Sequence, residues 1–434
     1  MLLRIIARNV GVSAVLKLGS FLLQFSLLPV LIRELGKAEF GVWVAMQSLV
    51  LWIVTLDFGI STGVRNKLVE AISLGQHEKA RGYVSSAFYG QVGLWGVVSL
   101  VALGLLTGLK LPWNEWMNST VSNADLSLAL FFCFFTFAFN LCCSVVNGVL
   151  YAHHWNGLTG VVGVTASLGL LLYVLAMRSL GYEISLPSLA FANFCTFMIA
   201  QCFLAAYVFG VFRDLRPRWE DFSVDAFREV VQLGIQFLVV ELTFLILFVM
   251  DRWIVLKTLG PEAVTDYEVV MRISSIVTTG FSLVVGPMWA LSGEAWAKRD
   301  RKGMDRLWRI MMLAMLPFFA VAIALGLIIN PLIHTVVDRT IQLSLLTSVA
   351  MVAYCIVVVW SNAYAGLLNG IGRIREQMIC SLFACAINIP LAFCLCRSPG
   401  VGIAGALLGT WVALLLFAIV APFVWINCRN SCES

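Results

Sequence analysis

Three full charges, those of Lys17, Glu241 and Arg272, lie within stretches of sequence that are otherwise apolar. A charge inside a membrane helix costs about 2.5–3.5 kcal/mol on insertion scales, so such a residue usually faces a polar cavity and contacts what passes through it. Lysine and arginine attract anions, and the flat guanidinium group of arginine can bind two oxygens of a phosphate or carboxylate at once. The three residues therefore predict a charged cavity inside a membrane protein, with two cationic side chains suited to an anionic substrate.

Lys17 belongs to a polar face of its apolar stretch. The other members of that face follow at steps of three or four residues, which is helical spacing, and they are Asn9, Ser13, Ser20 and Gln24. Hydrogen bonds between helices, with Lys17 extending to the membrane edge, would also explain this pattern. Because Lys17 lies near the middle of the stretch, we favour a cavity and predict Ser13, Ser20 and Gln24 as its lining.

Arg272 leads a second polar face. The later members of this face, again at helical spacing, are Ser275, Thr279, Ser282 and Gly286. We predict that Ser275 and Thr279 line the same cavity and that Arg272 acts together with Lys17 on the substrate.

Two carboxylates, Glu241 and Asp57, are candidates for coupling or gating. Glu241 follows Lys17 by 224 residues, the offset that relates the two halves of the chain, so the two side chains could pair across a cavity. An independent role for each charge stays open, because Glu241 does not share a helix face with the glutamines that precede it. Asp57 ends an apolar stretch beside two glycines, where an ion pair with Arg65 at the membrane boundary is an equally good interpretation.

Apolar stretches long enough to cross a bilayer account for most of the chain. Hydrophobic residues make up 60% of the 434 residues and charged residues 12%, and the mean hydropathy is +0.92, which excludes a soluble domain of this size. A membrane span needs about 20 mostly apolar residues. Twelve stretches qualify, at 9–32, 41–60, 83–108, 126–150, 157–177, 186–211, 230–250, 267–288, 307–330, 343–366, 377–396 and 401–426. The sequence therefore predicts an all-α polytopic membrane protein with about twelve transmembrane helices.

The distribution of Lys and Arg predicts the orientation of these spans. With the N-terminus in the cytoplasm, 19 of these residues lie on the cytoplasmic side and 8 on the other, so both termini are expected inside the cell. The net charge of +5 is then a consequence of topology, and a nucleic-acid partner is not expected. Asp251 and Arg252 fall at the outer end of the seventh stretch, where we expect an interfacial ion pair.

The second half of the chain repeats the first. At an offset of 224, Leu35-Gly36 matches Leu259-Gly260, and Glu70-Ala71 matches Glu294-Ala295. Each half holds six spans, an even number, so the halves form a parallel repeat about an axis along the membrane normal. We predict an N-terminal six-helix lobe at 1–211, a cytoplasmic linker at 212–229 and a C-terminal six-helix lobe at 230–434, with transport by alternating access.

Signals of enzyme chemistry are missing from the sequence. The twelve cysteines lack CxxC or Cys/His metal spacing, and no glycine-rich phosphate loop or Ser/His/Asp cluster stands out. We therefore predict a protein that is not an enzyme, with no catalytic residue, no metal site and no cofactor; coupling to H⁺ or Na⁺ remains open.

A run of residues in the first two spans resembles a known family. The run is Leu35-Gly36-Lys-Ala-Glu-Phe40-Gly41-Val-Trp43, followed by Leu56-Asp57-Phe-Gly59-Ile and Arg65-Asn66. It is similar to the polysaccharide-export branch of the multidrug/oligosaccharidyl-lipid/polysaccharide flippase superfamily, and within it to the Wzx-type O-antigen flippases. The resemblance implies a MATE-like fold in the bacterial inner membrane and a role in lipopolysaccharide biosynthesis.

The family resemblance also implies a substrate and roles for the charged residues. The substrate would be an undecaprenyl-diphosphate-linked oligosaccharide, the O-antigen repeat unit, moved from the cytoplasmic to the periplasmic leaflet without ATP. Lys17 and Arg272 would bind the diphosphate, and Glu241 or Asp57 would serve coupling or gating. Membrane lipid and other polysaccharide-assembly proteins would be its partners.

Two rival functions remain open at this point. A multidrug or cation antiporter of the same superfamily would share the lobes, but we would expect carboxylates to dominate its cavity. A membrane-embedded polysaccharide polymerase or glycosyltransferase would need larger loops than this chain offers. The sugar composition, the coupling ion and the oligomeric state do not follow from the sequence, nor does a direct contact between Lys17 and Glu241.

Overall fold

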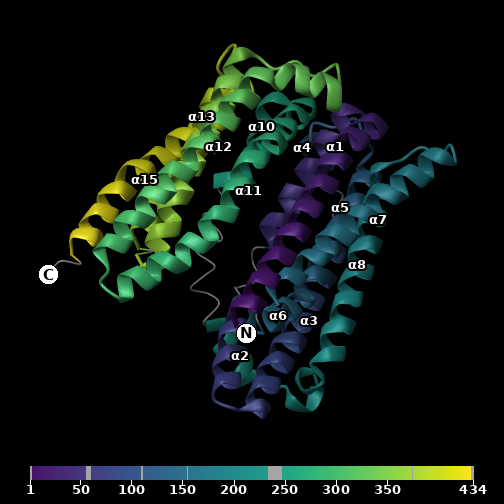
Figure 1. The fold of residues 1–434 in the computed structure, drawn as a ribbon. Coiled ribbons are helices and arrows are strands. Elements are labelled where there is room, and N and C mark those ends of the chain that lie inside the picture. Colours follow the sequence, from purple (N-terminus) through teal and green to yellow (C-terminus); the bar gives the residue numbers. More distant parts are fainter. Residues whose placement is uncertain are drawn as a thin grey trace. The chain divides into compact units, whose positions relative to one another are not determined.

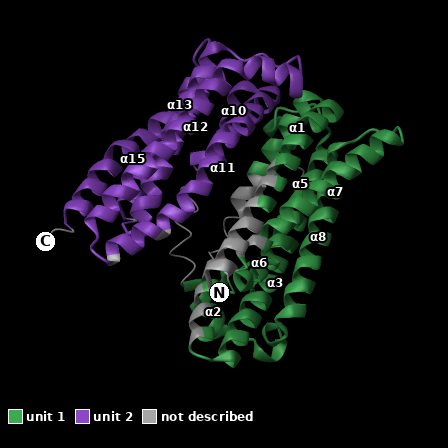
Figure 2. Ribbon diagram, in the orientation of Figure 1, with its two compact units in different colours: residues 1–242 green, residues 243–434 purple. Residues whose placement is uncertain are grey.

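A computed structural model describes residues 2–54, 60–108, 111–153, 155–232, 247–373 and 375–431. Over these residues the chain is a set of long helices joined by short turns, and it contains no β-strand (Figure 1). The contacts between residues divide it into two compact units, Met1–Leu242 and Thr243–Ser434 (Figure 2).

The first unit contains the helices that the N-terminal half of the sequence predicts. They are α1 (Leu2–Val54), α2 (Ile60–Ser73), α3 (His77–Gly108), the short α4 (Trp113–Trp116), α5 (Asn123–Cys142), α6 (Ser144–Ala152), α7 (Gly160–Ser179) and α8 (Leu186–Val211). Side-chain caps set two of the starts: Ser122 accepts a hydrogen bond from the Asp125 amide before α5, and Ser185 forms a capping box with Ser188 before α8.

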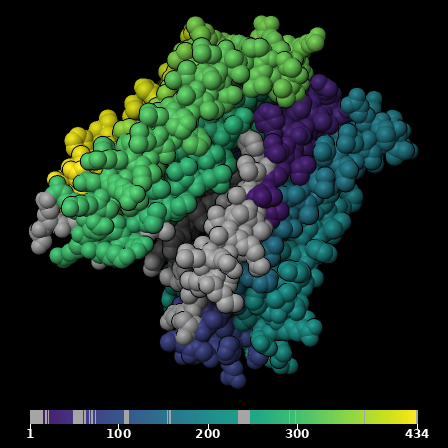
Figure 3. All heavy atoms as spheres, in the orientation of Figure 1, coloured from purple at the N-terminus to yellow at the C-terminus, as the bar shows by residue number. Residues whose placement is uncertain are grey.

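The second unit holds six described helices. They are α10 (Met250–Leu259), α11 (Pro261–Ala297), α12 (Arg301–Val336), α13 (Leu345–Gly370), α14 (Arg375–Arg397) and α15 (Ala404–Asn430). Large apolar side chains on α12 point away from the unit, with Leu313 66% and Leu327 80% exposed (Figure 3, green). A helix with such an outer surface is suited to lipid, as the composition predicts.

Nine helices among the described residues are long and apolar enough to cross a membrane. They agree with the predicted spans except the first, second and seventh. The first two predicted spans lie within α1, and most of the seventh falls at 233–246, outside the described residues. The all-α membrane fold predicted from the sequence is confirmed.

The internal repeat is visible in the backbone. Gly36 breaks α1 with φ 76° and ψ 162°, and its counterpart Gly260 precedes α11 with φ 92° and ψ 176°. Gly75 and Arg299, again 224 residues apart, both have positive φ, of 69° and 51°, in the turn before the next helix. A positive φ costs little only for glycine, so Arg299 occupies a conformation that the fold itself imposes. Matching breaks at matching positions confirm the repeat.

The predicted linker, 212–229, packs on α3 of the first unit. Arg81 binds both carboxylate oxygens of Asp221 at 2.7 and 3.1 Å. Ser85 and Ser86 accept hydrogen bonds from the backbone amides of Arg218 and Ser223, respectively. The limits predicted for the lobes, 1–211 and 230–434, stay a prediction, since the division between the units falls inside 233–246.

Candidate functional site

The predicted site residues of the first unit are described only in part. Ser20 and Gln24 are half-buried on α1, and the Gln24 amide donates a hydrogen bond to the Ser20 hydroxyl at 3.2 Å. The side chains of Ser13 and Lys17 lie outside the described part of the chain, as do Asp57 and Glu241 altogether. The roles predicted for these four residues therefore stay predictions.

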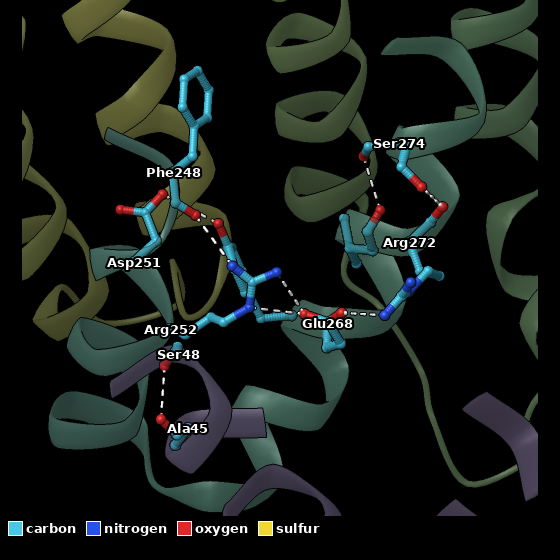
Figure 4. Close-up of polar contacts among 11 residues, drawn as sticks. Ala45, Ser48, Phe248, Asp251, Arg252, Glu268, Arg272 and Ser274 are labelled. Atoms are coloured by element: carbon cyan, nitrogen blue, oxygen red, sulfur yellow. Dashed lines mark hydrogen bonds and ion pairs between the residues drawn. The ribbon is translucent and has the colours of Figure 1, made fainter. Parts of the chain in front are cut away.

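In the second unit, Arg272 lies on α11 within a chain of ion pairs. Its guanidinium contacts Glu268 Oε1 at 3.1 Å, one helical turn away. The other oxygen of Glu268, Oε2, accepts from Nε and Nη2 of Arg252 on α10, both at 2.9 Å (Figure 4). Two cations share one carboxylate, so the group of three carries a formal charge of +1. We call Arg252, Glu268 and Arg272 the charge triad.

Exposure differs along the charge triad. The side chain of Glu268 is 7% exposed and that of Arg272 is 26% exposed. Ser275 is half-buried and donates to the Arg272 carbonyl oxygen at 2.6 Å, while Thr279, one turn further along α11, is exposed. Arg272 is thus accessible on one side, where an anion could approach it.

Asp251 is the second buried carboxylate of this region, with 1% of its surface exposed. Its oxygen Oδ2 accepts hydrogen bonds from Thr410 on α15 at 2.7 Å and from Tyr267 on α11 at 3.1 Å. The amide of Asn388 on α14 donates to Oδ1 at 3.4 Å. All three donors are neutral. An ionised carboxylate buried among neutral donors is expensive, so the site favours a bound proton or a bound cation.

An oxygen atom beside Asp251 is suited to such a cation. The side-chain oxygen of Asn388, Oδ1, is buried without a hydrogen-bond partner, while its amide nitrogen bonds to the Leu247 carbonyl oxygen at 3.3 Å and to Asp251. Carboxylate, amide and hydroxyl oxygens are the ligands that hard cations prefer. The described residues contain no cluster of three His, Cys, Asp or Glu side chains suited to a metal.

A cavity of about 610 Å³ opens at one end of the same helices. Leu259 of α10, Cys396 of α14 and Ile403, just before α15, line it. These residues stand seven or eight positions along the chain from Asp251, Asn388 and Thr410, which is about two helical turns or 11 Å. The cavity therefore lies in line with the Asp251 site.

The interfacial pair expected for Asp251 and Arg252 is wrong. Asp251 is buried, and Arg252 bonds instead to Glu268 and to the Phe248 carbonyl oxygen at 3.2 Å (Figure 4). The side chains of neighbouring residues on a helix point in directions about 100° apart, so adjacency in sequence does not bring two charges together.

Sequence reasoning missed Glu268, Tyr267, Asn388 and Thr410. One signal could have found Glu268, because it precedes Arg272 by four residues and so shares its helix face. A second signal is the pair of dipeptides Asp251-Arg252 and Tyr267-Glu268, which bond residue to residue across α10 and α11. Asn388 and Thr410 gave no comparable signal.

The first unit lacks this chemistry at the matching positions. At the offset of 224, the residues opposite Asp251, Arg252, Tyr267 and Glu268 are Leu27, Leu28, Trp43 and Val44. All four are buried and apolar. The repeat preserves the backbone between the units, and the charge triad and Asp251 belong to the second unit alone at these positions.

Long apolar helices, an internal repeat and buried charges define a multi-pass membrane transporter, and the solved structures that resemble the chain agree. One is an inward-facing multidrug resistance MATE family transporter of the MOP superfamily, with a TM-score of 0.72, 15% identity, and 93% of this chain and 95% of that chain covered. Another is a MOP superfamily transporter from Pyrococcus furiosus, with a TM-score of 0.68, 14% identity, and 98% and 96% covered. The predicted MATE-like fold is confirmed.

The family follows from the sequence comparisons. The polysaccharide biosynthesis protein family model matches residues 6–289, and the MatE model matches residues 237–394. The chain belongs to the polysaccharide biosynthesis protein family, which confirms the resemblance to Wzx-type flippases.

Two relatives match nearly the whole chain. A candidate O-antigen export protein of Yersinia pseudotuberculosis is 21% identical over 411 residues, covering 92% of this chain and 91% of the relative. A candidate O-antigen transporter of Salmonella typhimurium is 21% identical over 404 residues, covering 91% and 90%. The chain is therefore a membrane transporter of the flippase type, similar to proteins named for O-antigen export.

Proposed function

We propose that the protein is an inner-membrane flippase for undecaprenyl-diphosphate-linked oligosaccharide, the O-antigen repeat unit. It carries this lipid from the cytoplasmic to the periplasmic leaflet by alternating access of its two lobes, with both termini in the cytoplasm. The relatives named for O-antigen export support this proposal, as does the family model over residues 6–289. The single observation that carries it is the half-exposed Arg272 in a triad of net positive charge.

The diphosphate headgroup binds at Arg272, together with Lys17. A diphosphate offers several charged oxygens, and a guanidinium binds two of them in parallel. The polyprenyl tail needs no cavity, because it can stay in the bilayer beside the protein while the headgroup crosses. Ser275, next to Arg272, and Ser20 and Gln24 on α1 supply neutral hydrogen-bonding groups for the sugars.

Coupling to a proton or cation is proposed at a buried carboxylate. Asp251 joins Glu241 and Asp57 as a candidate, because it is buried among neutral donors and faces the partnerless oxygen of Asn388. The cavity in line with Asp251 offers the ion an approach along α10.

The test is to delete the gene and locate the lipid-linked oligosaccharide. The proposal expects loss of surface polysaccharide, with complete repeat units accumulating on their lipid in the cytoplasmic leaflet. Intact surface polysaccharide with new sensitivity to cationic drugs would contradict it and favour the antiporter. Accumulation of incomplete repeat units would instead favour a glycosyltransferase, and flipped but unpolymerised units would favour a polymerase.

A further inference from the structure

We infer that Glu268 is a specificity-determining residue: it holds Arg272 in the empty transporter, and only an anion that attracts Arg272 more strongly than one carboxylate can take its place. The inference rests on the proposed role of Arg272 as a diphosphate contact. It adds a residue to that site and states what the residue selects.

The two oxygens of Glu268 have different tasks. Oε2 accepts two hydrogen bonds from Arg252, from Nε and Nη2, each at 2.9 Å. Oε1 contacts Arg272 through Nη2 at 3.1 Å. Losing Arg272 therefore leaves the carboxylate with its doubly bonded partner, Arg252.

This arrangement keeps the exchange affordable in free energy. A buried carboxylate without any partner is strongly destabilising, so a lone Glu268–Arg272 pair would resist opening. Arg252 remains and continues to neutralise Glu268 after Arg272 has turned to the ligand. Arg252 is itself anchored by the Phe248 carbonyl oxygen at 3.2 Å, so it stays on Glu268 (Figure 4).

The competition with Glu268 selects for charge. A ligand carboxylate offers Arg272 about what Glu268 already offers, so it gains little by displacing it. A diphosphate carries more than one negative charge and more acceptor oxygens, and both strengthen its hold on a guanidinium. Glu268 thus favours a diphosphate over a singly charged group, and it also supplies an internal anion that takes Arg272 back when the headgroup leaves.

The experiment measures binding of inorganic pyrophosphate, and of acetate as a singly charged anion, to the full chain in lipid nanodiscs by calorimetry. In Glu268→Gln we expect pyrophosphate to bind about threefold to tenfold more tightly, the range for loss of one competing ion pair. Its preference over acetate should shrink, and export in cells should slow because the headgroup leaves late. Glu262→Gln, on an exposed residue in the first turn of α11, is the matched control and should bind like the wild type.

A second variant guards against misfolding. Glu268→Gln leaves two arginines without a carboxylate, so Arg252→Gln with Glu268→Gln removes one charge of each sign and should also bind pyrophosphate more tightly. Weaker or unchanged pyrophosphate binding in the double variant, with binding lost in Arg272→Gln, would overturn the inference and leave the proposed function standing. Wild-type binding and export in Arg272→Gln would instead remove Arg272 from the headgroup site, and the inference with it.

Discussion

The two buried carboxylates of the second unit differ in what compensates their charge. Glu268 lies between two arginines, whereas the three hydrogen-bond donors to Asp251 are neutral. A carboxylate held by cations stays ionised and can organise them, while one held by neutral donors gains from binding a proton or cation. The two residues are therefore suited to separate tasks, although they lie on neighbouring helices.

Arg272→Gln and Lys17→Gln should each abolish export of surface polysaccharide without lowering the amount of protein in the membrane. Glutamine keeps most of the side-chain length and loses the charge that the diphosphate needs. Gel analysis of surface polysaccharide and immunoblotting of membranes measure the two quantities. Arg397→Gln, which changes an exposed arginine stacked over Phe393, is the control and should export normally. Normal export in both test variants would contradict the headgroup assignment.

Asp251→Asn should make export slower and independent of the coupling gradient, because an amide neither takes up a proton nor attracts a cation. Thr410→Val removes the shortest hydrogen bond to Asp251, at 2.7 Å, and keeps the size of the side chain. Since a hydrogen bond to a charged group is involved, we expect about a tenfold change in the apparent affinity for the coupling ion. Flipping in proteoliposomes with imposed H⁺ or Na⁺ gradients measures this. Thr335→Val, on an exposed residue of α12, is the control; an Asp251→Asn variant that responds to gradients like the wild type would refute the assignment.

Close helix contacts position the site at the scale of the elements. Near the end of α13, a Cβ atom on Gly370 would collide with the Ser292 hydroxyl and with the Trp289 carbonyl oxygen of α11. The Ser292 hydroxyl also bonds to the Leu367 carbonyl oxygen at 3.1 Å. This contact fixes α11, the helix that carries Glu268 and Arg272, against α13, so the precision of the charge triad depends on small residues far along the helix.

Gly370→Ala should therefore destabilise the second unit by about 1–3 kcal/mol, the usual cost of overpacking. Gly286→Ala is the matched control on α11, because nothing lies within 4 Å of the added methyl group. There alanine should be neutral or slightly stabilising, since it favours a helix more than glycine does. Thermal unfolding in detergent compares the two variants; equal melting temperatures would mean that the α11–α13 contact yields without cost.

The linker is attached to the first unit by a pH-dependent contact. Hydrogen bonds from Lys67, at 2.9 Å, and from Tyr83, also at 2.9 Å, lower the pKa of the Glu229 carboxyl below its ordinary value. A lowered folded pKa contributes stability that is present above the unfolded pKa and is lost as the pH falls through the folded value.

Hydrogen exchange of the helical residues 224–232 should thus speed up at acidic pH in the wild type. Glu229→Gln should show faster exchange already at neutral pH and a smaller further change on acidification. Exchange measured by mass spectrometry from pH 7 to pH 4 provides the comparison. Identical pH profiles in the two proteins would show that Glu229 does not hold the linker in place.

At the scale of the whole molecule, the sequence predicts the elements better than the site. Apolar length and the 224-residue offset were enough for the spans and for the repeat, because these depend on local composition and order. Arg272 was found by its depth and its polar helix face. The partners of Asp251 could not be found in this way, since Asn388 and Thr410 follow it by 137 and 159 residues and approach it only through helix packing.

The repeat of the backbone and the difference in side chains have a consequence for the history of the chain. The breaks at Gly36 and Gly260 are shared because both halves need the same turn, and selection on geometry acted on both alike. Leu27, Leu28 and Val44 stand where the second half carries charges, so selection on chemistry acted on one half. A duplicated ancestor needed to evolve an ion-sensing core in only one copy, and the other copy was left free to diverge with the glycan that each bacterial surface displays.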